Sequence, residues 1–227
     1  MQQSIMKGLL LIMLAVIFSA IATVLPRLDF RVSGEPLGFT VVVDAGHGGK
    51  DRGASSRGGL FESDINLAIA LFLKRELEVR GINVVMTRET SHWLASPHAP
   101  NKKRDDMANR KRIIQNANPD VVVSIHMNTF PNPGVRGLQT FYNPKDEKSQ
   151  KFATAIQNEF NNSELNFYRV PRPGNYYILD QTGFTGVLVE CGFLSNAEDE
   201  RLFSQSAHQR IIAYYIAKAV VRTLVTS

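Results

Sequence analysis

The sequence predicts a single α/β domain with a mainly parallel, twisted central sheet of about six strands, flanked by helices on both faces. Two observations lead to this class. Short runs of β-branched residues alternate with longer stretches of helical periodicity, which is the order of β-α-β units. Several of the short runs are apolar throughout, as in strands covered on both faces. The chain has 227 residues, 44% of them hydrophobic, which suffices for one well-buried domain but not for two.

The predicted elements begin with a β-branched strand at residues 41–43, followed by a glycine-rich turn that contains His47. Residues 65–80 are expected to form a helix that packs on the sheet and is closed by Gly81. Residues 82–87 are the second strand. A strand, a helix and a strand in this order indicate a parallel pair joined by a right-handed crossover.

The rest of the chain continues the alternation. We expect helices at residues 104–116, 145–160, 197–203 and 205–224, and strands at residues 121–126, 138–142 and 186–190. The strand at 138–142 alternates as an outer strand does. Residues 161–180 form a polar segment rich in Asn and Pro that also contains several tyrosines, and we assign no helix or strand to it.

The first 25 residues are expected to be an export signal or a membrane anchor. Residues 8–25 carry no charge and reach the lower length limit for crossing a hydrocarbon core of roughly 30 Å. Lys7 and the sequence Ala20-Ile21-Ala22 resemble a signal peptide with a cleavage site, but the apolar run is longer than usual for one. An uncleaved anchor is therefore favoured. Residues 26–37 are predicted to be a linker, and residues 38–227 the catalytic domain.

The formal net charge is +5, which suits an anionic partner. The basic residues are scattered and not interleaved with aromatic residues, so no nucleic acid partner is expected. A polyanionic cell wall or lipid headgroups fit an exported chain better. Cys191 is the only cysteine, so no internal disulfide can form and stability must come from the core.

Three predicted strands carry a metal-binding or acid–base residue at or just beyond their carboxyl ends, namely His47, His126 and Glu190. In open α/β sheets the functional crevice lies at this edge. Glu62 falls where the first helix begins, on the same edge, because that helix follows the strand before His47. Two histidines and one carboxylate with an open fourth position are a common catalytic zinc site, and a second carboxylate beside them can act as the base.

Several of these residues also have a structural alternative to a catalytic or metal-binding role. The alternative for Glu190 is a buried carboxylate in an ion pair, but an unpaired buried carboxylate is costly, so this alternative also requires a metal ion or an arginine beside it. Glu62 is otherwise a complement to the dipole of its helix. Cys191 is expected to be structural, because strand alternation turns it away from the side that Glu190 faces. We expect solvated loop or helix positions for His92, His98 and His208.

Four motifs in the chain resemble the signatures of the zinc-dependent N-acetylmuramoyl-L-alanine amidases. They are Asp44-Ala45-Gly46-His47-Gly48-Gly49, Phe61-Glu62, Ser124-Ile125-His126-Met127-Asn128 and Leu188-Val189-Glu190-Cys191-Gly192-Phe193-Leu194-Ser195-Asn196. The resemblance spans residues 38–224, and Thr87-Arg88 and Arg110 are also placed as in that family. With one apolar N-terminal segment and the segment at 137–142, the chain is most similar to the germination-specific amidases of spore formers.

The resemblance implies the chemistry and its residues. One Zn²⁺ ion would be bound by His47, Glu62 and His126, and Glu190 would be the catalytic carboxylate. The substrate would be peptidoglycan, cut at the amide between N-acetylmuramic acid and the L-alanine of the stem peptide in spore cortex maturation or germination. Among the expected substrate contacts, Asn128 is one, and Arg88 and Arg110 are expected either to clamp the carboxylates of the stem peptide or to be solvated at the surface. The chain would be exported, either anchored in a membrane or secreted to the cell wall or the forespore intermembrane space.

Three further points follow from the resemblance. Some relatives carry an inhibitory helix before the second histidine strand, but residues 90–101 are too few for one. Control by an activating partner protein stays open. Two alternative functions also stay open, a catalytically silent peptidoglycan-binding protein tethered to a membrane and a zinc carboxypeptidase that acts on the stem peptide.

Overall fold

The computed structural model describes residues 37–165, 167–180 and 183–226. The expected signal or anchor at residues 1–25 lies outside the described residues, as does the expected linker apart from Leu37. Among the helices of the described ranges, none combines the length and the apolar character that a membrane span requires.

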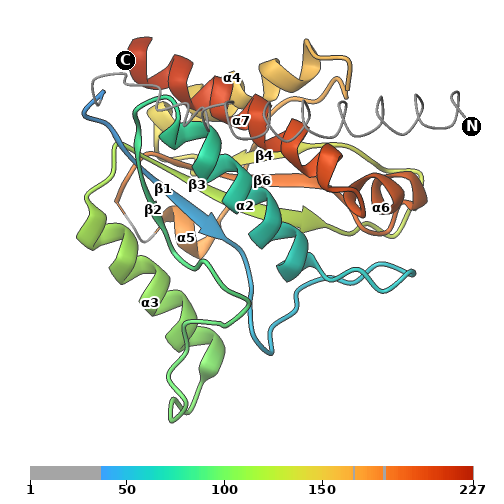
Figure 1. Ribbon diagram of the computed structural model, residues 1–227, viewed down its shortest axis with the longest axis horizontal. Helices are drawn as coiled ribbons and strands as arrows, with labels where there is room; N and C mark the ends of the chain where they lie inside the picture. Colours follow the sequence, from blue (N-terminus) through green and yellow to red (C-terminus); the bar gives the residue numbers. More distant parts are fainter. Residues whose placement is uncertain (1–36, 166, 181–182, 227) are drawn as a thin grey trace, which may run out of the picture. The chain divides into compact units, whose positions relative to one another are not determined.

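Strands and helices alternate along the described chain as the sequence predicts (Figure 1). The strands are β1 (Thr40–Ala45), β2 (Asn83–Met86), β3 (Val121–Asn128), β4 (Gln139–Tyr142), β5 (Arg172–Pro173) and β6 (Gly186–Phe193). The helices are α2 (Glu62–Glu78), α3 (Lys102–Ala117), α4 (Glu147–Asn161), α5 (Tyr177–Asp180), α6 (Ala197–Phe203) and α7 (Ser206–Thr226). The loop at residues 90–101 contains no helix, as expected from its length.

The six strands form one sheet in the order β2-β1-β3-β6-β4-β5. The first four are parallel, and β4 is antiparallel to β6. The two residues of β5 pair with the outer side of β4, so β4 lies near the edge, as its alternating sequence indicated. These observations confirm the single α/β domain with a mainly parallel sheet. The prediction for residues 161–180 was incomplete, because β5 and the short helix α5 lie there.

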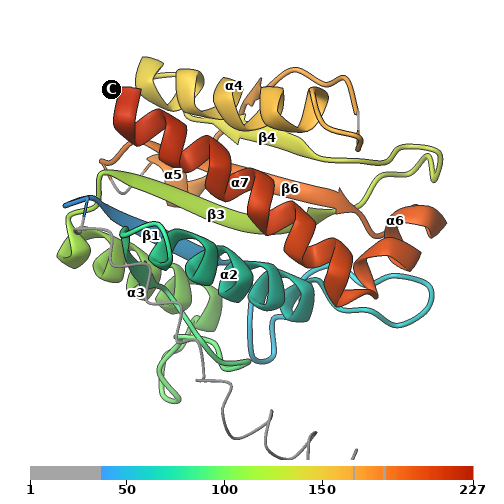
Figure 2. The same cartoon turned by 45° about the horizontal axis from the view of Figure 1, so that its top comes forward.

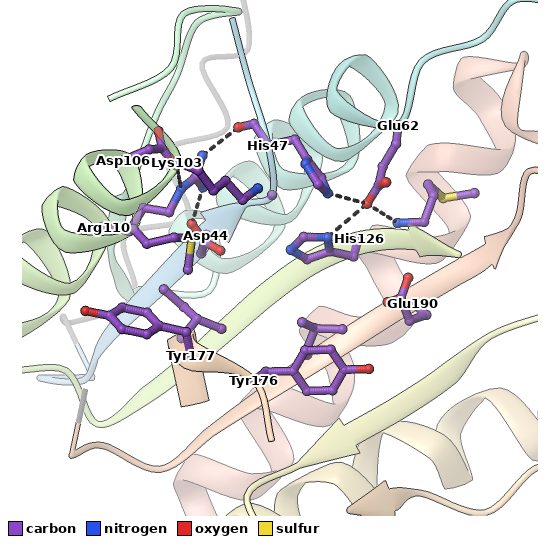
Figure 3. A pocket seen from close by; sticks show the side chains of 15 residues that line it. Asp44, His47, Glu62, Lys103, Asp106, Arg110, His126, Tyr176, Tyr177 and Glu190 are labelled. Carbon is purple, nitrogen blue, oxygen red and sulfur yellow. Dashed lines mark hydrogen bonds and ion pairs between the residues drawn. The ribbon is translucent and has the colours of Figure 1, made fainter. Parts of the chain in front are cut away.

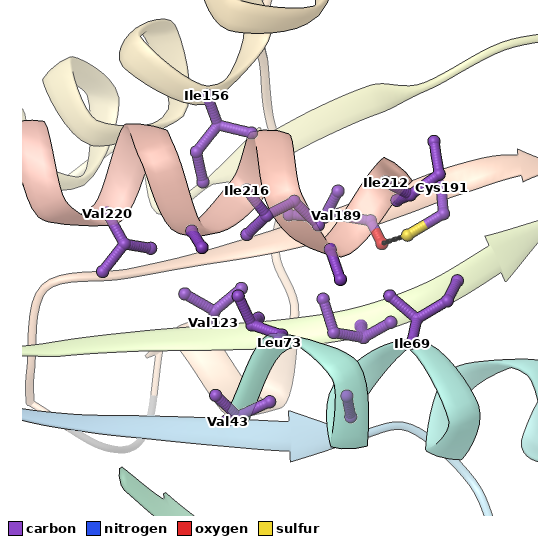
Figure 4. Packing of buried hydrophobic residues seen from close by; sticks show 14 of the residues in the cluster. Val43, Ile69, Leu73, Val123, Ile156, Val189, Cys191, Ile212, Ile216 and Val220 are labelled. Atoms are coloured by element: carbon purple, nitrogen blue, oxygen red, sulfur yellow. Dashed lines mark hydrogen bonds between the residues drawn. The ribbon is translucent and has the colours of Figure 1, made fainter. Parts of the chain in front are cut away.

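Helices cover both faces of the sheet. In Figure 2, α4, α7 and α2 lie side by side over one face, and α3 and α5 lie behind the sheet. The larger core cluster joins the first face to these three helices, through side chains such as Val43, Leu73 and Ile216 (Figure 4). The second cluster includes Val42, Val122 and Leu188, which point to the opposite face. Because residues on both sides of these strands are buried, the apolar runs are continuous rather than alternating.

Strand alternation also separates Cys191 from its neighbour Glu190. Cys191 is buried in the larger cluster beneath α7, as predicted, whereas Glu190 lines a pocket. His92 and His98 are exposed, as predicted. The prediction for His208 was wrong: it is buried in α7 with its ring 4.8 Å from that of Phe203, because the first turn of α7 packs back on α6.

The carboxyl ends of the parallel strands position the candidate residues at one edge of the sheet. His126 lies within β3 and pairs in register with Glu190 of β6. His47 follows β1 by two residues, and Glu62 is the first residue of α2. The helix begins earlier than predicted, because its polar first turn continues the helical backbone and the Glu62 N–H donates to the carbonyl of Ala54.

Candidate active site

The side chains of His47, Glu62 and His126 converge at the edge of the sheet (Figure 3). One ligand atom from each lies within 4.8 Å of the other two. Glu62 Oε1 is 2.9 Å from His126 Nδ1 and 3.2 Å from His47 Nε2. The two imidazole rings meet edge to face with their centroids 5.0 Å apart. Three segments far apart in the sequence thus present two nitrogens and one oxygen to a common point.

Asp51 fixes the orientation of the His47 ring. Its carboxylate lies 2.9 Å from His47 Nδ1, and since a carboxylate only accepts, Nδ1 must carry the proton. Nε2 is then the nitrogen that faces Glu62. Burial alone lowers the pKa of His47, but the nearby carboxylates of Glu62 and Asp51 outweigh it and raise the pKa. Lys103 forms an ion pair with Asp51 on its solvent side.

Glu62 is held as an ionised carboxylate. Its Oε2 accepts from the Ala54 N–H at 2.8 Å, and its Oε1 accepts from the Met127 N–H at 3.1 Å. Burial alone raises the pKa of Glu62, but hydrogen bonds from His126 and His47 and their charges outweigh it and hold the pKa well below its usual range. A buried carboxylate with these contacts is suited to face a cation.

Glycine permits the close approach of these side chains at two positions. A Cβ atom on Gly46 would lie 2.3 Å from Nε2 of His126, which is far inside van der Waals contact. Gly53 has φ +67°, and a Cβ there would lie 2.4 Å from Glu62 Oε2. The glycine-rich turn therefore leaves the space in which the three ligand groups meet.

The chemistry of this donor set fits a zinc ion. Two imidazole nitrogens and one carboxylate oxygen suit a borderline cation and leave a fourth position open. The carboxylate of Asp51 behind His47 matches the outer partner that a metal-binding histidine usually has. Among the described residues, these three form the only group of three or more His, Cys, Asp or Glu that is close enough to bind a metal ion.

Glu190 lies beside this group without belonging to it. The residue is 8% exposed, and its Oε2 is buried with no hydrogen-bond partner among the described residues. Burial raises the pKa of Glu190, the charges of His126 and His47 lower it and the charge of Glu62 raises it, so that the resulting pKa is about 7. An unpaired carboxylate oxygen of this kind is suited to accept a proton near neutral pH.

A pocket of about 330 Å³ opens in front of these groups. Figure 3 shows the histidines and Glu62 on one side, Glu190 below them, and the aromatic rings of Tyr176 and Tyr177 across the space. Tyr176 packs edge to face on Phe141 with the ring centroids 5.3 Å apart, and Tyr177 is 45% exposed. The sequence predicted no role for these tyrosines, although the polar segment that contains them stood out in composition.

A buried ion-pair network lies under the turn that contains His47. Asp44 of β1 accepts from Thr87 at 2.7 Å, from Ser124 at 2.6 Å and from Arg110 at 2.6 Å. Arg110 also donates to Asp106 at 2.7 Å. Burial alone raises the pKa of Asp44, but the Arg110 charge and the two hydroxyl donors outweigh it and lower the pKa to about 2. The network joins β1, β3 and the residue after β2 to α3.

The three predicted substrate contacts differ in their surroundings. Arg88 and Arg110 are buried, and both donate to main-chain carbonyls of the turn before and at His47. Arg110 also lines the pocket. Contact of either arginine with the substrate stays a prediction. Asn128 is half-buried at the end of β3, where its side chain accepts from the N–H of Thr129, and its contact with substrate stays a prediction.

A family model and several known proteins resemble most of this chain. The family described as N-acetylmuramoyl-L-alanine amidase matches residues 41–222. A germination-specific N-acetylmuramoyl-L-alanine amidase of Bacillus subtilis is 32% identical over 189 residues, which cover 82% of this chain and 79% of the relative. The fold is also similar to the CwlD amidase of Clostridioides difficile, solved in complex with the GerS lipoprotein, with 35% identity, a TM-score of 0.80 and coverage of 83% and 100% of the two chains.

A further solved structure supports the same assignment. The catalytic domain of the amidase CwlV of Bacillus (Paenibacillus) polymyxa is 30% identical, with a TM-score of 0.73 and coverage of 83% of this chain and 99% of that chain. The matched residues span β1 to α7 and include His47, Glu62, His126 and Glu190. The chain therefore belongs to the N-acetylmuramoyl-L-alanine amidase family.

Proposed function

We propose that this chain is a zinc-dependent peptidoglycan amidase that cuts the amide between N-acetylmuramic acid and the L-alanine of the stem peptide. Family membership supports the reaction. The observation that supports the mechanism is the convergence of His47, Glu62 and His126 beside the unpaired Oε2 of Glu190. In this proposal the first three residues bind zinc and Glu190 is the general base.

Zinc, Glu190 and Asp51 have separate roles in the proposed reaction. Zinc, when bound, supplies a Lewis acid that polarises the carbonyl group and lowers the pKa of a water molecule toward about 7. Glu190 takes the proton of the attacking water and passes it to the amine nitrogen of L-alanine, so that the amide C–N bond breaks and the carboxylate is regenerated. Asp51 keeps Nδ1 of His47 protonated, which leaves Nε2 for the metal.

The shape of the pocket favours a substrate that extends beyond the cut bond. Tyr176 and Tyr177 form the wall opposite the proposed zinc ligands. Aromatic rings of this kind offer flat apolar faces with a polar hydroxyl at the edge, which suits a substrate built of sugar and peptide. We propose that these two tyrosines position the substrate across from Glu190.

The reaction is tested by the products of the full chain acting on purified peptidoglycan. Free stem peptides that begin with L-alanine, identified by mass spectrometry after incubation with zinc and absent with a chelator, are the expected result. Release of terminal amino acids alone would instead identify a carboxypeptidase, and binding without products would identify a silent binding protein. Glu190→Gln is the matched control, because it keeps the size of the side chain.

We also propose that the chain acts in spore cortex maturation or germination, with a partner protein. The germination-specific relative in Bacillus subtilis supports the setting, and the complex of the Clostridioides difficile relative with a lipoprotein supports a partner. Loss of the gene is expected to change the fragments that a muramidase releases from spore cortex and to leave those of vegetative walls unchanged. The same change in both walls would contradict the setting.

The proposed location is outside the cytoplasm, with residues 1–25 as an uncleaved anchor and residues 26–37 as a linker. The uncharged run at residues 8–25 supports it. Full-length protein is expected in the membrane fraction of its own cell. Recovery in the soluble exported fraction, with a new N-terminus near residues 21–23, would identify a cleaved signal instead.

A further inference from the structure

Arg88 is a buried arginine whose guanidinium donates to main-chain carbonyls rather than to a carboxylate. The residue follows β2 by two positions and is 4% exposed. It donates to four carbonyl oxygens, those of Ala45 at 2.9 Å, Gly46 at 2.8 Å, Ser63 at 2.9 Å and Thr90 at 2.9 Å. Burying a cation against neutral acceptors costs free energy, so its place next to the pocket calls for an explanation.

Two of these carbonyls belong to the neighbours of metal-ligand candidates. Gly46 directly precedes His47, and Ser63 directly follows Glu62. The same nitrogen of Arg88, Nη2, donates to both carbonyls. A single guanidinium therefore joins the turn after β1 to the first turn of α2, the two segments that present His47 and Glu62.

The turn that contains His47 has a strained backbone, which hydrogen bonds from its surroundings must hold in place. His47 has φ 61°, in the left-handed region, which costs roughly 1 kcal/mol for a residue with a side chain and persists only where the surroundings enforce it. Arg88 holds the two carbonyls before this residue, and Arg110 holds the carbonyl of His47 itself. Gly48 passes so close that a Cβ there would lie 3.1 Å from Nε of Arg88. The arginine thus packs inside the turn as well as bonding to it.

We propose that Arg88 is a positioning residue that sets the distance between His47 and Glu62, so that their ligand atoms reach one metal ion. The inference rests on the proposed function, because it takes these two residues as metal ligands. Arg110 supports the same turn but also neutralises Asp44 and Asp106, whereas the hydrogen bonds of Arg88 go to carbonyls alone. Arg88 is for this reason the arginine whose replacement isolates the positioning effect.

The test measures zinc affinity of the metal-free full chain by competition with a chromophoric chelator, for wild type, Arg88→Lys and Arg88→Met. Lysine keeps the charge and the stem but lacks the planar fork that reaches several carbonyls at once. Arg80→Met is the control, because Arg80 also donates to a main-chain carbonyl and lies just beyond the other end of α2. Zinc affinity is expected to fall about tenfold in Arg88→Lys and up to about a hundredfold in Arg88→Met, and to stay at the wild-type value in Arg80→Met.

A second readout follows the geometry of the ligands. Visible absorption of the cobalt-substituted chain reports how the ligands surround the metal, and its bands are expected to shift in Arg88→Lys and not in Arg80→Met. Wild-type zinc affinity and an unchanged cobalt spectrum in a folded Arg88→Lys would overturn the inference and leave the proposed function intact. Absence of zinc binding in wild type would overturn the proposed function itself. Failure of Arg88→Lys to fold would also overturn the inference, because the guanidinium group of Arg88 would then be required for the stability of the whole domain and not for the position of the two ligands.

Discussion

Glu190 and His126 are register partners on the adjacent parallel strands β6 and β3. The pairing brings a carboxylate with a buried, unpaired oxygen next to the group formed by His47, Glu62 and His126. Because both residues are part of a buried sheet, the distance between their main chains is set by strand pairing rather than by a mobile loop. This arrangement suits a general base, Glu190, that takes a proton from a water molecule bound at the neighbouring group of His47, Glu62 and His126.

Zinc content should depend on His126. Alanine at this position removes one of three proposed ligands, so zinc measured by elemental analysis of the purified protein is expected to fall well below one ion per chain. His98→Ala is the matched control, because His98 is exposed and outside the group. Wild-type zinc content in His126→Ala would remove His126 from the ligands. The fold should survive, since the large core lies between the sheet and its helices.

Asp51 should tune the affinity for the metal without binding it. Asp51→Ala leaves Nδ1 of His47 without its acceptor, so the ring can turn and the wrong nitrogen can carry the proton. Loss of such an outer partner typically lowers zinc affinity by about 10- to 100-fold, which chelator competition would detect. Asp64→Ala, at an exposed position in the first turn of α2, is the control. Equal affinities in the two variants would contradict the role of Asp51.

Stability at acid pH should depend on Asp44. Its pKa is about 2 in the folded chain and 3.8 in the reference state, so the ionised form stabilises the fold at all pH values above 3.8. As the pH falls from 3.8 toward 2, this contribution of about 2 kcal/mol is lost. Urea unfolding with a chelator present should show Asp44→Asn less stable than wild type at neutral pH, with a gap that narrows below pH 3.8. A difference in stability between the two proteins that does not change with pH would contradict the lowered pKa of Asp44.

Cys191 should be chemically silent in the native protein. It is buried beneath α7, and burial raises the pKa of its thiol well above the usual value. A thiol reagent is expected to modify it only after denaturation. Cys191→Ala should keep zinc and turnover and lose about 1 kcal/mol of stability. Rapid modification of the folded protein, or loss of turnover with zinc retained, would contradict a structural role.

The sequence predicted the parts of the site that follow from local patterns. β1, β3 and β6 are runs of β-branched or apolar residues, and the histidine or glutamate at the end of each run marks the functional edge of the sheet. Glu62 could be placed because its helix begins at the same edge. The sheet and its helices followed from the same alternation. His47, Glu62, His126 and Glu190, which local patterns identified, all line the pocket.

Other parts could not be predicted because they depend on contacts between distant segments. Tyr176 reaches the pocket only because α5 and its preceding turn pack on Phe141 of β4. Asp51 lies in a turn-rich segment, and its spacing of four from His47 was the one available signal. Arg88 and Arg110 resemble solvated or substrate-binding arginines in sequence, and only the folded turn shows which carbonyls they hold.

In the proposed mechanism, Glu190 moves the proton while three other residues bind the metal. Glu190→Gln keeps the size of the side chain but cannot accept a proton as a carboxylate does. Zinc content and turnover on peptidoglycan, measured on the same preparation, should show zinc at the wild-type level and a loss of turnover of roughly 10²- to 10⁴-fold. Turnover equal to that of wild type would contradict the role of Glu190 as the general base. Loss of zinc together with turnover would identify Glu190 as a metal ligand instead.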